Sequence, residues 1–149
     1  YALNYLTGKE HVDNQTYVEH LKPHCTSTEL YKSVVNDEST SVFNGKIKVY
    51  KDAQKTQAFQ SNANIINDDN ARAYAKPELE IYADDVKCSH GSTTGQFDNE
   101  ALFYLRARGI KESSAKKLLL HAFASEVLDA VENGVVREFI EKKIEKKIK

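Results

Sequence analysis

The sequence contains no methionine, only two cysteines and no long apolar run. A membrane-spanning helix needs about 18 or more consecutive apolar residues, and no stretch approaches that length. Two thiols in a chain without a secretory signal indicate reduced cysteines rather than a disulfide framework. Because the chain begins at Tyr1 and lacks Met, we expect it to be a piece of a longer protein, about one domain in size.

Motifs of several catalytic classes are also missing. The polar run 91–95, with sequence GSTTG, lacks the Lys-[Ser/Thr] pair of a phosphate-binding loop, and the chain contains no G-x-S-x-G nucleophile elbow. Asp84 and Asp85 are adjacent, but no acid/base partner is obvious beside them. Composition and spacing alone therefore indicate a β-rich module with helices attached.

Charge is unevenly distributed along the chain. The net charge is −1, yet residues 135–149 hold one arginine and five lysines against three glutamates, which leaves −4 for residues 1–134. Glutamates interrupt this basic segment too often for a nucleic-acid-binding tail. We expect a solvated helix face and no nucleic-acid partner.

Residues 1–97 have the pattern of short strands and turns, with no helical period between Thr40 and Gly95. Segments 45–56 and 77–88 align at an offset of 32 residues. A strand-and-turn unit that recurs at a fixed period predicts a solenoid, in which aligned apolar residues stack. A β-sandwich with a chance internal resemblance is the alternative. The aligned apolar pairs are Ile47 with Leu79 and Val49 with Ile81.

From Asp98 onward the apolar period changes from 2 to 3.6, which predicts a helical part over residues 98–149. The first helix is expected over 98–109, with Asp98 as N-cap and Gly109 just past its end. The second runs from about 112 to 132, is stopped by Asn133-Gly134, and carries apolar residues Leu118, Leu119, Ala122, Val127, Leu128 and Val131. The third begins at Val135 and carries Val136, Ile140, Ile144 and Ile148 along one edge. We expect the three helices to pack as a small bundle on the end of the β part.

Cys88 and His90 are candidate metal ligands. Residues two apart in a strand face the same side, so this pair would present a thiolate and an imidazole together. Two ligands make half a metal site, and the chain has no second Cys/His pair at structural-zinc spacing. The alternative is a buried cysteine beside a hydrogen-bonded histidine at a turn.

The other histidines carry weaker signals. His20, His24 and Cys25 gather around Pro23, where a local metal site is conceivable, although such a cluster on a Pro-broken loop more often reflects chance. His11 lies in a polar run and His121 lies among leucines. We expect both to be structural.

The string LEIYADDVKCSHGSTTGQFDNEALFYLRARGI, residues 79–110, resembles the C-terminal signature of the SufB/SufD family of the SUF iron–sulfur cluster assembly machinery. Segments 16–35 and 41–49 resemble the same family, so the likeness covers most of residues 11–125. The order Cys-Ser-His-Gly at 88–91 is typical of the SufD branch rather than the SufB branch.

This resemblance implies a right-handed parallel β-helix over residues 1–97 followed by a C-terminal helical subdomain over residues 98–149. It also implies a non-catalytic subunit that pairs with SufB through the β-helices and binds the ATPase SufC through the helices, with ATP hydrolysed in SufC. Family β-helices are much longer, so earlier coils and an N-terminal helical region are expected to be missing. The implied location is cytoplasmic, or the organellar stroma in plastid-bearing cells.

The resemblance also assigns roles to single residues. The histidine at the position of His90 is implicated in nascent cluster assembly at the SufB interface, and Cys88 is its matched neighbour. Cys25 matches a family cysteine, whereas His24 does not. The implied cofactor is a transient iron–sulfur cluster shared with SufB, with none tightly bound by this chain alone.

The strongest likeness in the helical part falls on the segment that begins at Asn99 and ends at Ile110. Four of its residues are aromatic or arginine anchors of the kind enriched at interface hot spots, and we expect them to dock the ATPase. At least one of the aromatics is alternatively expected to pack the helices onto the β part. The four anchors are Phe103, Tyr104, Arg106 and Arg108.

Two other functions are compatible with parts of the sequence. A β-solenoid enzyme that acts on carbohydrate or transfers acyl groups would use Asp84, Asp85 and His90 as acid/base groups, but it leaves the helices without a role. A membrane component of an ABC transporter would explain an ATPase partner but lacks a spanning segment. If the coil nearest Tyr1 has lost a neighbour, its open edge should pair with another copy or fray.

Overall fold

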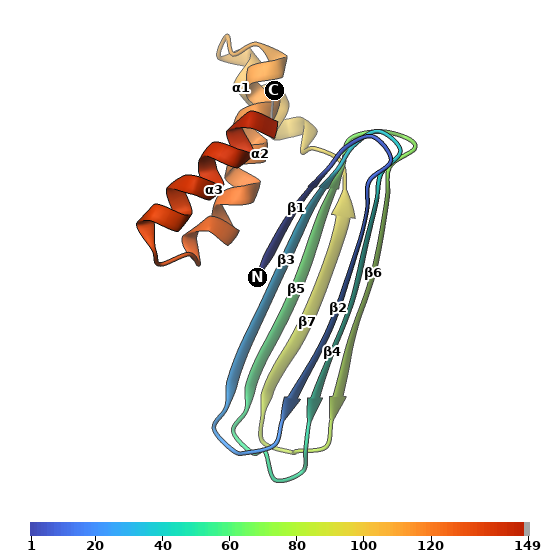
Figure 1. Ribbon diagram of the computed structural model, residues 1–149, viewed down its shortest axis with the longest axis vertical. Helices are drawn as coiled ribbons and strands as arrows, with labels where there is room; N and C mark the ends of the chain where they lie inside the picture. The colour runs from blue at the N-terminus through green and yellow to red at the C-terminus, as the bar shows by residue number, and fades with distance from the viewer. Residues whose placement is uncertain (148–149) are drawn as a thin grey trace.

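The computed structural model describes residues 1–147, which form strands followed by helices (Figure 1). The strands are β1 (Ala2–Leu6), β2 (His11–His20), β3 (Thr26–Val35), β4 (Thr40–Val49), β5 (Gln57–Ile66), β6 (Arg72–Ile81) and β7 (Lys87–Gly95). The helices are α1 (Asn99–Ala107), α2 (Glu112–Asp129) and α3 (Gly134–Lys147). The change from strands to helices falls between Gly95 and Asn99, close to the expected position.

The strands form two parallel sheets, one with the order β1-β3-β5-β7 and the other with the order β2-β4-β6. The chain alternates between the sheets, so each coil contributes one strand to each, and the two sheets face one another as the walls of a solenoid (Figure 1). Parallel pairing throughout excludes the antiparallel sandwich. The predicted fold class, solenoid coils followed by helices, is therefore confirmed.

The predicted stacking of coils is also confirmed in register. In the pairing of β4 with β6, Ile47 lies opposite Leu79 and Val49 lies opposite Ile81. The sequence analysis missed one preceding copy of the unit, because β2 pairs with β4 at an offset of 29 rather than 32 residues (His11 opposite Thr40). Turns of unequal length absorb the difference, and a search at one fixed period cannot find such a copy.

The inner wall formed by the three-stranded sheet is largely apolar, although it also buries His20 and Ser41. Phe43, Ile47 and Val49 are fully buried on β4, and Ile47 and Val49 belong to a cluster that also contains Ala58 from the opposite sheet. The alternation of buried and partly buried residues along β4 is regular, as expected for a strand with one face inside. The four-stranded sheet adds Leu6 and Val35 to the apolar packing, in a second cluster.

The inner wall formed by the four-stranded sheet is polar over much of its length. Its buried side chains are hydrogen-bonded between neighbouring residues and neighbouring coils, so that their desolvation is offset. Gln60 Nε2 donates to Glu29 Oε2 at 2.7 Å, and Asn64 Nδ2 donates to Asn62 Oδ1 at 2.7 Å. The buried polar residues of this wall are Glu29, Ser33, Gln60, Asn62 and Asn64.

Gly45 lies where side chains of both walls approach one another. A Cβ added at this position would lie 2.4 Å from Gln60 Nε2 and 2.5 Å from the ring of Phe43. No side chain fits there without moving a residue of each wall. Glycine is therefore required at this point by the close approach of the walls, not by its backbone angles.

The helix ends agree with the sequence prediction for α1 and differ for α2. Asp98 caps α1 by accepting from two backbone N–H groups of the first turn, and Gly109 follows the helix with φ of 85°. The second helix ends earlier than expected, at Asp129. Asn133 does not stop it. Instead, its Oδ1 accepts from the N–H groups of Val135 and Val136 and so caps the start of α3.

The helices pack against the outer face of the four-stranded sheet, beside β1 and β3, and not on the end of the coils as expected (Figure 1). Val34, on the outward face of β3, packs against Leu120 of α2. Lys32, on the same face, is also buried. Its Nζ donates to the carbonyl of Phe123 at 2.9 Å and forms an ion pair with Glu126.

The buried face of α2 also differs from the predicted stripe. Leu118 is 51% exposed, whereas Leu120, which the stripe omitted, is buried together with Val127 and Leu128. The predicted contact residue Ile148 lies outside the described residues. Among the described residues, no helix is both long and apolar enough to cross a bilayer.

Candidate functional site

Strand β7 carries the two candidate ligands and is the last strand of its sheet. Its only hydrogen-bonded neighbour in the described structure is β5, with Cys88 opposite Ala58 and His90 opposite Gln60. The other sheet ends at β6 in the same coil. The helices contact β1 and β3, so this end of the solenoid is left open by them.

Contacts along β7 show which way its side chains point. Cys88 packs against the core cluster that contains Ala58, Ser92 Oγ lies 3.5 Å from Asn62 Oδ1, and Thr94 Oγ1 accepts from Asn64 Nδ2 at 3.2 Å. These residues alternate along the strand, so His90 belongs to the same inward row. The prediction that Cys88 and His90 share a face is confirmed.

Cys88 is half-buried, and its surroundings make it a poor thiolate. Burial raises the pKa of the Cys88 thiol above its ordinary value, and a hydrogen bond with the backbone of Ala58 opposes this only in part. Metal ligation needs the deprotonated sulfur. Cys88 in this setting is therefore better suited to packing than to holding iron on its own.

His90 is exposed at the open end, although its row is the inner row. In the part of the chain that the structure describes, no three His, Cys, Asp or Glu side chains come together in a way that could hold a metal ion. His90 and Cys88 thus offer at most two ligands. A complete coordination shell would need groups from another molecule.

The carboxylates of the enzyme hypothesis lie elsewhere. Asp84 and Asp85 are in the turn before β7, and Asp85 is ion-paired with Lys55. Four residues lie between Asp85 and His90, and the strand part alone, from Lys87 to His90, spans roughly 10 Å at the usual rise per residue. The structure does not bring these three residues into one acid/base site.

The residues around Pro23 do not form a site either. His20 is 5% exposed inside the coil, where its Nε2 is 2.9 Å from Ser27 Oγ, and burial lowers its pKa. His24, with φ of 59°, and Cys25 lie in the exposed turn beyond β2, and Cys25 Sγ contacts the carbonyl of Pro23 at 3.8 Å. Of the histidines expected to be structural, His121 lies partly buried on α2, while His11 is exposed at the start of β2.

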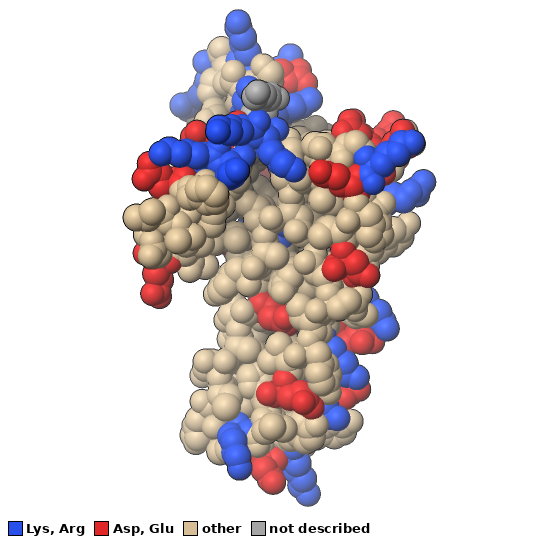
Figure 2. All heavy atoms as spheres, in the orientation of Figure 1, with Lys and Arg blue, Asp and Glu red and all other residues tan. Residues whose placement is uncertain are grey.

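Three of the four anchors lie on α1, which has no buried residue, and the fourth, Arg108, is its C-cap. Phe103 is 74% exposed and Tyr104 is 56% exposed, so neither packs the helix onto the solenoid, which corrects the alternative expectation for these aromatics. The guanidinium of Arg108 stacks over the ring of Tyr104 at 4.5 Å, and Arg106 pairs with Glu112 at 3.4 Å. Figure 2 shows Lys and Arg side chains gathered over the helices at the top of the view, with acidic side chains among them.

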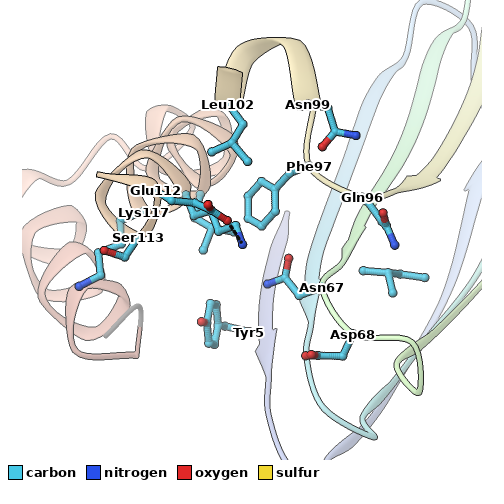
Figure 3. A pocket seen from close by; sticks show the side chains of 13 residues that line it. Tyr5, Asn67, Asp68, Gln96, Phe97, Asn99, Leu102, Glu112, Ser113 and Lys117 are labelled. Atoms are coloured by element: carbon cyan, nitrogen blue, oxygen red, sulfur yellow. Dashed lines mark ion pairs between the residues drawn. The ribbon is translucent and has the colours of Figure 1, made fainter. Parts of the chain in front are cut away.

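A cleft of about 550 Å³ lies between the helices and the four-stranded sheet (Figure 3). Tyr5 and Asn67 line it on the sheet side, Phe97 and Leu102 on the linker and α1, and Glu112 on α2. The Glu112 carboxylate is paired with Lys116 within the helix at 3.0 Å. None of the candidate ligands or paired aspartates lies in this cleft.

Sequence reasoning missed the polar row behind His90. Glu29 and Gln60 lie in register with it on β3 and β5, and both are buried. Within residues 1–147, the Oε1 atom of Gln60 has no hydrogen-bond partner. The period of a single strand carries no signal for this row, because it exists only across coils.

Comparisons with known proteins place most of the chain in one family model. The family model described as "SUF system FeS cluster assembly, SufBD core domain" matches residues 1–123. This range includes every strand, α1 and the first part of α2.

The chain is similar to several curated proteins. It is 44% identical over 126 residues to the iron-sulfur cluster assembly protein SufD of Escherichia coli, covering 85% of this chain and 30% of that protein. It is 42% identical to the SufBD family protein slr0076 of Synechocystis, over 87% of this chain and 29% of the relative. The chloroplastic protein ABCI7 of Arabidopsis thaliana is 37% identical over 85% of this chain and 28% of its own length. The chain therefore spans about a third or less of these relatives.

Proposed function

Since the chain belongs to the SufB/SufD family of iron–sulfur cluster assembly proteins, we propose that it is a non-catalytic, SufD-type part of the assembly scaffold. Its His90 would act as one ligand of a nascent cluster at an interface with a SufB-type subunit. The cluster is cargo in this scheme. It is built at the interface and released.

The observation that carries this proposal is the open end of the solenoid. Both edge strands there, β6 and β7, have backbone groups free on one side, and His90 projects from the inner row of β7 between them. An uncovered strand edge is a ready template for pairing with another chain. A partner solenoid that extended the two sheets would place its own side chains beside His90.

The side chains of the last coil suit such a partner. The inner row of β6 is apolar at Leu79 and Ile81, and Ile81 is exposed at this end. The inner row of β7 is polar, at His90, Ser92 and Thr94. A second β-helix with the same two-wall interior would continue the apolar row with an apolar row and the polar row with a polar one.

Incomplete ligation fits a scaffold that must release its product. A single neutral imidazole is a weaker and more pH-sensitive iron ligand than a cage of thiolates. The half-buried Cys88, whose thiol pKa is raised by burial, adds little affinity before the partner arrives. The interface would therefore hold the cluster only while both subunits contribute.

The helices supply a second surface. Phe103, Tyr104 and Arg108 form an exposed aromatic and guanidinium cluster on α1 that no other described part of the chain covers. Such groups are enriched at interface hot spots. We assign this cluster to the docking of a SufC-type ATPase, which would hydrolyse ATP and move the scaffold subunits relative to one another.

The enzyme alternative is less well supported. Asp85 is engaged by Lys55 in an exposed ion pair, and among the described residues Asp84, Asp85 and His90 do not come together as a cluster. An isolated chain with glycosidase or acyltransferase activity would nevertheless overturn the scaffold proposal.

The test is reconstitution of this SufD-type subunit, as the full protein, with SufB-type and SufC-type partners under anaerobic conditions. His90→Ala should remove most iron and sulfide from the assembled complex while leaving subunit association and the melting temperature nearly unchanged. Cys88→Ser should be milder if the thiol only packs, and equally severe if it ligates iron. Wild-type cluster content in the His90 variant would refute the proposed site.

A matched pair of variants tests the ATPase surface. Replacing Arg106 and Arg108 by alanine should weaken binding of the ATPase without unfolding α1, because both side chains are exposed. Replacing the exposed Lys142 by alanine on α3 serves as the control for charge loss. Unchanged ATPase affinity in the Arg106/Arg108 variant would remove α1 from that interface.

A further inference from the structure

His90 is the exposed end of a buried polar row that crosses three coils. Glu29 on β3 lies opposite Gln60 on β5, and Gln60 lies opposite His90 on β7. The first step of the row is a hydrogen bond of 2.7 Å from Gln60 Nε2 to Glu29 Oε2. The second step relates the same Gln60 to His90 by the same in-register geometry, across neighbouring strands about 4.8 Å apart.

Gln60 has one free hydrogen-bonding atom, and it is an acceptor. The side chain is 2% exposed, its Nε2 is engaged by Glu29, and its Oε1 is buried without a partner. In the opposite amide orientation, Oε1 would face the carboxylate of Glu29, and two acceptors would oppose each other. The Glu29 contact therefore identifies the atom beside Glu29 as Nε2 and the other as Oε1. An unpaired buried carbonyl is costly and calls for an N–H or O–H donor.

The Glu29 contact constrains the direction of the amide. The oxygen and nitrogen of a glutamine diverge from Cδ, so with Nε2 held on the side of Glu29, Oε1 is turned away from β3. Thr16 also has a buried, unpartnered hydroxyl, and of the Gln60 atoms it is Nε2 that borders the same space at Gly45. In the row itself, the next side chain with an N–H is His90.

We propose that Gln60 is the positioning residue for His90: its Oε1 accepts one imidazole N–H and thereby holds the ring in one neutral tautomer. The other ring nitrogen then carries a lone pair directed away from Gln60, toward the open end. Histidine ligands of metals are commonly oriented in this way by a hydrogen bond at the second nitrogen. Glu29 acts one step further back, by fixing the amide of Gln60.

This inference rests on the proposed function for its biological meaning, but its test does not. The chain is prepared with ¹⁵N-labelled histidine rings, and the two neutral tautomers are distinguished by ring-nitrogen shifts at about pH 8, above the ordinary histidine pKa. The ring-nitrogen signals of His90 are identified as those that are missing from the His90→Gln variant. The exposed His11 serves as a reference within the same sample.

In the wild type, the ratio of the favoured neutral tautomer to the other one should be roughly two- to tenfold higher for His90 than for His11. This is the range that a neutral hydrogen bond of ordinary net strength produces. In Gln60→Met, which keeps the side-chain volume and removes both polar atoms, the ratio should fall to that of His11. Glu29→Gln should reduce the preference too, because the amide of Gln60 is no longer held in one orientation. If Gln60→Met does not fold, Glu29→Gln tests the inference in its place.

The control is Asn64→Leu, which disturbs the same polar wall at its bonds with Asn62 and Thr94 but lies outside the row of His90. It should leave the His90 ratio unchanged. A wild-type His90 with the ratio of His11, or an unchanged ratio in folded Gln60→Met, would overturn the inference.

Cluster content in the reconstituted complex separates this inference from the proposed function. Gln60→Met should lower iron loading severalfold, less than His90→Ala does. If the tautomer depends on Gln60 while His90→Ala retains its cluster, the proposed function falls and the positioning role stands. If His90→Ala loses its cluster while the tautomer ignores Gln60, the function stands and the positioning role falls.

Discussion

The two inner walls of the solenoid are stabilised by different interactions. The wall of the three-stranded sheet buries Phe43, Ile47 and Val49 and is stabilised by apolar packing. The wall of the four-stranded sheet buries Gln60 and Asn62, along with other polar residues, and depends on hydrogen bonds between neighbouring coils. The comparison shows that an interior row can be polar when every coil supplies partners for its neighbours.

The difference between the walls also determines what reaches the open end. An apolar row ends in a hydrophobic patch, which can bind another protein but offers no ligand to a metal. A polar row ends in groups whose orientation is set by the coils behind them. His90 is at the end of the second kind of row.

The largest expected effect comes from the apolar wall. Ile47→Ala removes a fully buried side chain from the core cluster and should destabilise the protein by about 2–5 kcal/mol. Ile47→Val, which removes one methylene, should cost only about 0.5–1.5 kcal/mol. Both are measured by denaturant unfolding, and equal effects of the two variants would mean that Ile47 is not tightly packed.

The next effect tests the place where the walls meet. Gly45→Ala would put a methyl group against both Gln60 and Phe43 and should destabilise by about 1–3 kcal/mol through overpacking. Gly91→Ala is the control, because nothing lies within 4 Å of its added Cβ. If thermal unfolding gave the same midpoint for both variants, the close approach at Gly45 would be disproved.

The polar wall is tested by Asn62→Leu, which keeps the number and branching of the side-chain heavy atoms. The change removes the acceptor of Asn64 and the donor to the Tyr31 carbonyl, so it should cost about 1–3 kcal/mol despite the added apolar surface. Ser61→Ala, on the exposed outer face of the same strand, should change stability by less than about 0.5 kcal/mol. A more stable Asn62→Leu protein would show that hydrogen bonds are not what holds this wall together.

The smallest effect is a pH dependence inside the coil. Burial lowers the pKa of His20, so below its ordinary value of about 6.5 the unfolded chain binds a proton that the folded chain does not. Stability should therefore fall as pH drops through this range. His20→Gln should flatten the part of the unfolding curve between about pH 7 and 5, whereas replacing the exposed His11 by Gln should not. An unchanged pH profile in His20→Gln would contradict the assignment.

The fold was predictable from the sequence where chemistry repeats at one spacing. The echo between segments 45–56 and 77–88 gave the register of β4 on β6, since stacked coils select similar residues at the same row. The helix cap at Asp98 could be predicted because it is an interaction between residues close together in the sequence. The placement of the helices was not, because it depends on Lys32 and Val34, which face outward on β3 and lie about ninety residues from their partners on α2.

The candidate site was predictable only in part, for a similar reason. The two-residue spacing of Cys88 and His90 is enough to place them on one face. The row behind His90 escaped prediction because along β5 the larger apolar residues Phe59 and Ile65 alternate with polar ones, and the pattern suggests that the apolar face is the inner one. In the structure Phe59 is exposed and Gln60 is inside.

The buried ammonium of Lys32 has a mechanical consequence. It ties the backbone and the Glu126 side chain of α2 to β3, and it lies three residues along that strand from Glu29. A pull on α2 must either expose a charge that is sheltered from water or carry β3 with it. These contacts thus join the helical part to the strand that also carries Glu29, the first member of the row that ends at His90.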